Sequence, residues 1–425
     1  MRVNKVCNPF PGVKVNRRPR LAAALAAALL PALTVAGCGS DVNKPKGTIG
    51  YVRGFAGLIA GDEPRSVTIA RDVLTAGGTA ADAAVALYFT MAVTLPSSAG
   101  LGGGGACLVF KDEGKGKSTT EVLDFRPHSA AIPGNPRGMY ALHAKYGVLR
   151  WEQLLNSAEQ MARFGVPVSR VFATDLAKAA PAIAQDAEAR KLFMPGGRPL
   201  NEGEQMIQAD LATTLSKLRQ RGPGELYAGP LANEYVQAVL ATGVRIGIDE
   251  LRSYTPVWSK GVTQPQGFDT VHFVEGSGLA PNWAGGQAPS DAPDAATGFA
   301  IGDSFGNAVA CTIAMPVAFG QGRFMPGWGL AAAPVGILPP RGVEPLMVVN
   351  HNSHEVRLAL AASHPAALMA AARRFLVEAQ PLDKAVAVSQ GHVNGLHCGG
   401  GQVSAARCTA AVDPNGYGLS MIVGK

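Results

Sequence analysis

The sequence predicts a layered α/β domain, because a helix that is apolar on every side precedes two strand-like stretches. Thr79-Ala80-Ala81-Asp82 fits a capping box and starts the helical run AVALYFTMAVTL, which ends before Pro96. The stretches ACLVF and TEVLDF follow, separated by the turn KDEGKGKS. A helix apolar all round is buried on every side, so we expect it to pack beside the sheet that this hairpin begins.

The remaining elements are expected from local patterns. EPRSVTIARDVLTAGG has helical spacing and stops at two glycines, and residues 150–243 read as mostly helical. Residues 261–295 are rich in Gly, Pro, Ala and Asp and lack periodicity, so a loop is expected there. Beyond residue 296 the pattern predicts the hairpins TGFAIGD/NAVACTIA and LMVVN/EVRLAL, a helix at HPAALMAAARRFLVEA, and two strands around the turn at 413–416.

Residues 1–37 are expected to be a lipoprotein signal peptide. Six cationic residues precede the apolar run LAAALAAALLPALTVAG, which Pro31 interrupts and which is too short for a comfortable transmembrane helix. The run ends at Val35-Ala36-Gly37-Cys38, which resembles a bacterial lipobox, so we expect Cys38 to carry lipid. An ordinary signal peptide with a chance cysteine is the alternative. Residues 38–47 would then be a tether, and the expected location is the periplasmic side of the bacterial cell envelope, anchored to the membrane by lipid.

The charge of the mature chain argues against nucleic acid as a partner. The whole chain carries a formal charge of +7, but without the signal peptide 32 Lys and Arg face 31 Asp and Glu. Nucleic-acid binding depends on clustered positive charge, so no such partner is expected.

Four cysteines remain after Cys7 and Cys38 are set aside. An exported protein can form disulfides, and Cys398 and Cys408 flank a short segment that a disulfide would close. Cys107 and Cys311 lie within apolar runs and are expected to be plain buried residues. The sequence has no C-x-x-C and no zinc spacing, so neither a metal nor a cofactor is expected.

Three motifs invite a functional interpretation that their context weakens. Gly100–Gly105 matches G-x-G-x-x-G, but a dinucleotide site needs a strand before it and a helix after it. His351 and His354 are expected at a hairpin tip, where a solvated turn is favoured over a metal site. Gly302–Gly306 matches the G-x-S-x-G of a serine hydrolase around Ser304, but that elbow requires a following helix. A strand-like stretch follows here, so a hairpin turn is favoured.

Eight stretches, taken together and in order, resemble one protein family. They are GGTAADAAVA, SSAGLGGGGACLVF, LDFRP, IPGNPRGMYALHAKYG, WEQLLNSAEQMARFGVPVS, IQADLATTLSKLRQRGPGELYAGPLANEYV, DELRSYTPV and GDSFGNAVACT. The chain resembles the gamma-glutamyltransferases, or glutathione hydrolases, a branch of the N-terminal-nucleophile hydrolases. The resemblance covers about residues 50–260 and 296–425.

The resemblance implies a four-layer αββα sandwich in which residues 48–295 and 296–425 correspond to the large and small subunits of one intertwined domain. It also implies a precursor that cuts itself and frees a Thr, whose own α-amine acts as the base in attack on a γ-glutamyl amide. Arg126, in the DFR motif, would bind the substrate's α-carboxylate, with Gly103 and Gly104 also in the substrate site. A structural ion pair is the alternative role for Arg126.

The sequence departs from the family pattern where the chemistry is expected. Counting back from Gly306 and Asn307, the family's nucleophile position falls on Ala296, and Thr297 stands one residue late. In a strand, one residue means the opposite face. Thr312 retains a family threonine.

Further substitutions affect the substrate site and the oxyanion site. Ala314 replaces a second threonine, and Pro316 replaces a substrate-binding Asn. LAAAPVGI replaces the family's Asn-Asn and acidic cluster, the paired serines after Pro345-Leu346 are absent, and a glycine-rich turn has become AASHPAAL.

These losses predict a fold kept without its chemistry. We expect a catalytically degenerate, membrane-tethered protein that stays one chain and acts in binding or as a scaffold, holding a γ-glutamyl or other carboxylate ligand near Arg126. The alternative is residual hydrolysis of γ-glutamyl amides by Thr297, with Thr312, after cleavage between Ala296 and Thr297. That alternative requires Thr297 to point toward Arg126.

Overall fold

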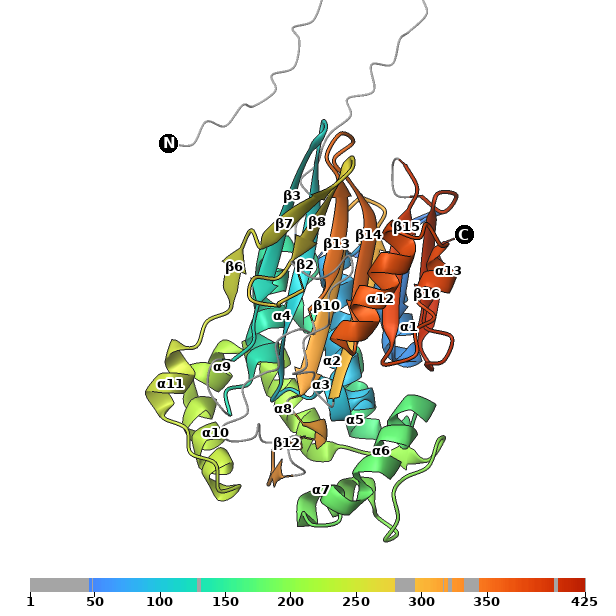
Figure 1. Cartoon of the computed structure of the whole chain (residues 1–425). Coiled ribbons are helices and arrows are strands. Elements are labelled where there is room, and N and C mark those ends of the chain that lie inside the picture. The colour runs from blue at the N-terminus through green and yellow to red at the C-terminus, as the bar shows by residue number, and fades with distance from the viewer. Residues whose placement is uncertain are drawn as a thin grey trace, which may run out of the picture. The chain divides into compact units, whose positions relative to one another are not determined.

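We describe a computed structural model of the chain (Figure 1). The structure describes residues 46–47, 49–127, 131–279, 295–315, 317–319, 323–331, 344–400 and 404–424. The chain divides into two units, Met1–Lys44 and Pro45–Lys425, and all described residues belong to the second. The expected signal peptide and the lipidation residue Cys38 therefore lie outside the described residues.

A seven-stranded antiparallel sheet contains strands from both ends of the described chain, in the order β17-β1-β9-β10-β2-β3-β6. The central pair, β9 and β10, is the hairpin expected after residue 296. The strands of this seven-stranded sheet are β1 (Gly57–Gly61), β2 (Gly104–Gly114), β3 (Lys117–Asp124), β6 (Val257–Ser259), β9 (Ala295–Asp303), β10 (Ala308–Met315) and β17 (Leu419–Val423).

A six-stranded antiparallel sheet lies against the first, in the order β16-β15-β14-β13-β8-β7. Leu58, Leu108 and Ala300 of the first sheet share a buried cluster with Met347 and Leu396 of the second. The strands are β7 (Val262–Gln266), β8 (Asp269–Phe273), β13 (Leu346–Asn350), β14 (Glu355–Ala362), β15 (Val393–Cys398) and β16 (Cys408–Val412).

Helices cover the outer face of each sheet (Figure 1). All of α2 is buried, and its N-terminus has the expected capping box, in which the amides of Thr79 and Asp82 each bond to the other residue's side chain. Against the seven-stranded sheet lie α1 (Pro64–Thr75), α2 (Ala80–Thr94), α3 (Pro96–Ala99) and α4 (Gly134–Tyr146). The helix α5 (Trp151–Phe164) packs on α2, and α8 (Ala209–Arg221) packs on α5. Against the six-stranded sheet lie α12 (Pro365–Leu376) and α13 (Leu382–Ala385).

The three buried clusters therefore separate four layers, and the expected αββα sandwich is confirmed. The region after α5 adds helices and short strand pairs at one end of the sheets (Figure 1). These are β4 (Val166–Pro167) with β5 (Gln205–Met206), β11 (Phe324–Met325) with β12 (Leu330–Ala331), and α6 (Arg170–Ile183), α7 (Ala187–Phe193), α9 (Gly224–Tyr227), α10 (Pro230–Ala241) and α11 (Ile248–Ser253).

One expectation about elements was wrong. Residues 261–295, expected as a loop, contain β7 and β8, which pair across the Gly267-Phe268 turn. Pairing with β13 stabilises these strands, so a long-range contact overrides a weak local pattern. The two strands expected around the turn at 413–416 are present, and they belong to different sheets, because β16 joins the six-stranded sheet and β17 the seven-stranded sheet.

Candidate functional site

Thr297 lies in the third position of β9, and its side chain faces the helical layer. It shares this face with Phe299 and Ile301, which pack in the core with α1 and α2. Its hydroxyl donates to Oδ2 of Asp62 at 2.8 Å and lies 3.7 Å from Sδ of Met91 in α2. Thr297 is 1% exposed, so this threonine is a buried residue with an acidic partner.

Asp62, directly after β1, accepts hydrogen bonds from three neutral donors. Besides the Thr297 hydroxyl, the backbone amide of Gly298 donates to Oδ2 at 3.2 Å, and Nδ2 of Asn394 donates to Oδ1 at 2.8 Å. The same Asn394 amide donates to the carbonyl of Gly298 at 2.8 Å. Because Asn394 belongs to β15, this network ties the two sheets together at the end where β9 begins.

A cavity of about 560 Å³ opens beside Thr297 and Asp62. The end of β1, the start of β9, α3, α6, the loop before α12 and the loop between α13 and β15 surround it. Its walls are Asp62, Leu95, Ser98, Val171, Asp175, Lys178, Ala179, Ala295, Ala296, Thr297, Ala318, Ser363, His364, Gly391 and His392. This volume falls within the range of roughly 300–1,000 Å³ found for small-molecule sites.

One face of α6 supplies both a carboxylate and an ammonium group to this cavity. Val171, Asp175 and Lys178 follow the i, i+4, i+7 spacing that places residues on one helix face. The Ser97 hydroxyl donates to Oδ2 of Asp175 at 2.6 Å. Burial raises the pKa of Asp175, although the Ser97 hydrogen bond and the nearby charges of Lys178 and His392 oppose that shift.

The two histidines of the cavity lie on loops of the six-stranded sheet. Nδ1 of His364 accepts the amide of Ala366 at 3.2 Å and so caps α12, and burial lowers the pKa of His364. The backbone amide of His392 donates to the Ser363 hydroxyl at 2.8 Å. His364 therefore enters the cavity as a neutral group near neutral pH.

The structure places Ala296 and Thr312 on the opposite face of the sheet from Thr297. Ala296 shares the face of Gly298, where an added Cβ would lie 2.8 Å from Cβ of Ala361 in the second sheet. Thr312 pairs directly with Gly298, and β9 pairs with β10 without a register shift from Ala295 to Gly302. No bulge therefore moves Thr297 toward Thr312, and the two candidate catalytic residues are not brought together.

Arg126 does not meet Thr297 in the cavity. Its guanidinium bonds to Asp124 through Nε at 2.9 Å and pairs with Glu344, a carboxylate that is 1% exposed. Burial opposes the charge, but the hydrogen bond to Asp124 and the charge of Glu344 outweigh it and raise the pKa of Arg126. Arg126 follows β3, which is three strands from β9, so the strands lie roughly 14 Å apart.

Gly103 and Gly104 lie at the start of β2, where the chain packs too closely for a side chain. A Cβ at Gly103 would lie 2.5 Å from the carbonyl oxygen of Ala314, and one at Gly104 would lie 2.4 Å from Cδ of Pro127. A strand rather than a helix follows these glycines, which excludes a dinucleotide fold at this motif.

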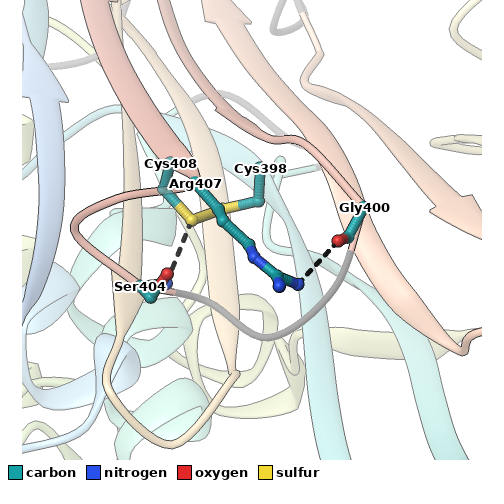
Figure 2. The surroundings of a disulfide bond; sticks show 5 residues. All are labelled: Cys398, Gly400, Ser404, Arg407 and Cys408. Carbon is teal, nitrogen blue, oxygen red and sulfur yellow. Dashed lines mark hydrogen bonds between the residues drawn. A yellow bond between two sulfur atoms is a disulfide. The ribbon is translucent and has the colours of Figure 1, made fainter.

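Two disulfides lie within the described part of the chain, and one of them was not expected. Figure 2 shows Cys398 joined to Cys408, with the Ser404 amide donating to Sγ of Cys408 at 3.3 Å. Arg407 closes the same loop by donating to the carbonyl of Gly400 at 2.9 Å.

The expectation that Cys107 and Cys311 are plain buried residues was wrong, because they form a disulfide with a Cα–Cα distance of 4.1 Å. They lie directly opposite each other where β2 pairs with β10. This pairing joins residues 204 positions apart, so local sequence could not reveal it.

The serine hydrolase alternative is wrong. Ser304 lies in the turn between β9 and β10, and the strand β10 begins at Ala308, where an elbow would need a helix. His351 and His354 lie in the turn between β13 and β14. Within the described ranges, no group of three or more His, Cys, Asp or Glu is arranged to hold a metal ion, and no helix is long and apolar enough to span a membrane.

The sequence reasoning missed most of the cavity residues. Asp62 follows a short strand, and Asp175 and Lys178 look like the solvated face of an amphipathic helix. Ser363 and His364 lie in the segment noted only as a lost glycine-rich turn. The signal that could have found Asp175 and Lys178 is their i, i+3 spacing beside Val171, but this spacing is common on exposed helices.

Comparison with known proteins agrees with the resemblance seen in the sequence. The family model described as gamma-glutamyltranspeptidase matches residues 66–128 and 115–281. The glutathione hydrolase proenzyme of Bacillus subtilis (strain 168) is 30% identical over 271 residues, which is 54% of this chain and 46% of that protein. The glutathione hydrolase proenzyme of Escherichia coli (strain K12) is 30% identical over 261 residues, or 55% and 43% of the two chains.

A solved structure shows the same fold over nearly the whole chain. The cephalosporin acylase from Bacillus halodurans superimposes with a TM-score of 0.73 at 16% identity, covering 88% of this chain and 96% of that one. At that identity the likeness shows the fold alone. This chain spans less than half the length of the two glutathione hydrolases that it matches. The family model covers half of the chain, in sequence order and within one αββα fold, so this protein belongs to the gamma-glutamyltranspeptidase family.

Proposed function

We propose that this protein is a catalytically degenerate member of its family that stays one chain, is held at the bacterial membrane by lipid on Cys38, and acts as a binding or scaffold protein. The observation that carries the proposal is the register of β9. Thr297 points into the helical layer and donates to Asp62, and the nucleophile position expected from the resemblance, counted back from Gly306 and Asn307, falls on Ala296. The matched family residues also end at 281, before this strand.

The neutralised arginine supports the same proposal. In the expected substrate site, Arg126 would bind a ligand carboxylate, but here Asp124 and Glu344 already surround its guanidinium. A ligand carboxylate at Arg126 would have to compete with Asp124 and with the buried Glu344 for the guanidinium.

A second candidate is residual hydrolysis of γ-glutamyl amides, as the names of the glutathione hydrolase relatives suggest. It is favoured by one observation, that Thr297 lines the cavity with its hydroxyl on a carboxylate. Cleavage between Ala296 and Thr297 would free an α-amine on Thr297 that could serve as the base.

The intact mass of the purified chain separates the two candidates. The sample must be reduced, because the Cys107–Cys311 disulfide would hold the two halves together after a cut. After days at neutral pH we expect one uncut chain and no turnover of γ-glutamyl amides above that of a Thr297→Val control. Two fragments divided before Thr297, with turnover that the substitution removes, would establish the enzyme instead.

A further inference from the structure

The cavity beside Thr297 carries separated charges of both signs. Asp62, Asp175 and Lys178 all line it, and the charges of Asp62 and Lys178 both act on Asp175. Among the described residues, no ion pair joins Lys178 to an acid, and none joins Asp62 or Asp175 to a base. Cβ atoms at i and i+3 of a helix lie about 5–6 Å apart, so Asp175 and Lys178 are close neighbours on α6, and the charge of Lys178 opposes the rise in the pKa of Asp175.

Asp175 is held ready to accept a hydrogen bond. The Ser97 hydroxyl engages only Oδ2 of Asp175, which leaves Oδ1 for a ligand. Asp62 has both oxygens occupied by Thr297, Gly298 and Asn394, so it contributes negative potential rather than an open acceptor. A ligand with only a negative charge would be repelled by Asp62 and Asp175, and a ligand with only a positive charge would leave Lys178 without a partner in the complex.

The rest of the wall is aliphatic. Leu95, Val171 and Ala179 face the cavity, and Val171 and Ala179 flank the two charged residues on α6. These side chains suit methylene groups, whose burial stabilises a complex by about 0.8 kcal/mol each.

We propose that this cavity binds an ω-amino acid, a zwitterion whose ammonium and carboxylate are separated by an aliphatic chain. The ammonium binds Asp175, the carboxylate binds Lys178, and the methylene groups pack on Leu95, Val171 and Ala179. An α-amino acid fits less well, because its two charges share one carbon and it has no methylene chain between them to pack on Leu95, Val171 and Ala179. This inference rests on the proposed binding role and places the ligand away from Arg126.

Four small molecules test the proposal by isothermal titration calorimetry with the full-length protein at neutral pH. They are 5-aminopentanoate, its isomer L-norvaline, pentanoate and 1-pentylamine. We expect saturable binding of 5-aminopentanoate and affinities at least about tenfold weaker for the other three. No saturable binding of 5-aminopentanoate at millimolar concentration, or equal binding of L-norvaline, would overturn the proposal.

Matched variants locate the site. Lys178→Met and Asp175→Asn should each weaken binding of 5-aminopentanoate at least about tenfold. Lys191→Met, an exposed lysine on α7 outside the cavity, should leave it unchanged. If Asp175→Asn fails to fold, Lys178→Met decides alone, because the exposed Lys178 side chain supports no ion pair among the described residues. Binding that neither variant weakens would place the ligand elsewhere.

The outcomes also separate this proposal from the proposed function. A chain that remains uncut but binds none of the four molecules contradicts only the ligand class. A chain that is cut before Thr297 and turns over γ-glutamyl amides contradicts the proposed function, whatever the titration shows.

Discussion

At Thr297, a shift of one residue decides which layer of the protein a hydroxyl enters. Successive side chains of β9 alternate between the helical layer and the second sheet. Thr297 therefore meets Asp62 and Met91, whereas the methyl group of Ala296 takes the face that Gly298 and Thr312 share. A threonine placed one position along this strand therefore faces the other side of the sheet and meets different partners.

His272 gives a prediction for pH dependence at the residue scale. It lies in β8, Nδ1 has no hydrogen-bond partner among the described residues, and burial lowers its pKa from 6.5 to about 4. Between about pH 6.5 and pH 4, His272 is protonated in the unfolded chain but stays neutral in the folded chain. Stability should therefore fall as pH drops from 6.5 to 4, by at most roughly 3 kcal/mol from this group.

Urea unfolding at pH 7.5 and pH 4.5 measures this effect. His272→Gln should lose less stability than the parent chain over that interval, while His351→Gln, at an exposed turn, should behave like the parent. An unchanged pH dependence in His272→Gln would show that other groups cause the loss.

At the scale of elements, Asp62 connects three strands. Its carboxylate accepts from β9 through Thr297 and Gly298 and from β15 through Asn394, directly after β1 ends. Removing it would leave three buried donors without their acceptor, each costing about 1–3 kcal/mol.

Asp62→Ala should therefore lower the free energy of unfolding by about 3 kcal/mol or more, measured by chemical denaturation. Asp72→Ala is the matched control, because Asp72 is exposed on α1 and its one ion pair within the described ranges is with Arg71, so the substitution should change stability by less than about 1 kcal/mol. Equal effects of the two substitutions would mean that the donors near Asp62 find other partners.

At the scale of the whole molecule, the two halves of the chain share one sheet and one covalent link. β9 and β10 from the second half lie between β1 and β2 from the first, and the Cys107–Cys311 disulfide joins β2 to β10. In the chain-entropy account, closing a loop of 204 residues stabilises by about 5 kcal/mol, against about 3 kcal/mol for the 10-residue separation of Cys398 and Cys408.

The double variant Cys107→Ala/Cys311→Ala should accordingly lose more stability than Cys398→Ala/Cys408→Ala, by about 2 kcal/mol in denaturant unfolding. The second variant is the matched control, since it also removes one cross-strand disulfide. A larger loss in that control would show that local strain or packing, rather than loop closure, governs both bonds.

The sequence alone was sufficient for features that depend on neighbours along the chain. The capping box at Thr79 and Asp82, the buried helix α2, the β9–β10 hairpin and the helix at 365–376 all follow from local spacing. The order of the family-like stretches was sufficient to predict the family and the four-layer fold.

Only the tertiary structure decided what distant residues do to one another. In the folded protein Cys107 forms a disulfide with Cys311, and Arg126 forms an ion pair with Glu344. The strands β7 and β8 form in a segment whose sequence has no periodicity. The tertiary structure also assembled the cavity from Asp62, α6 and the loop at 363–364, segments that are far apart in the chain. The reason is physical: local patterns determine which face a residue takes within its element, whereas partners across sheets and layers depend on how the elements pack.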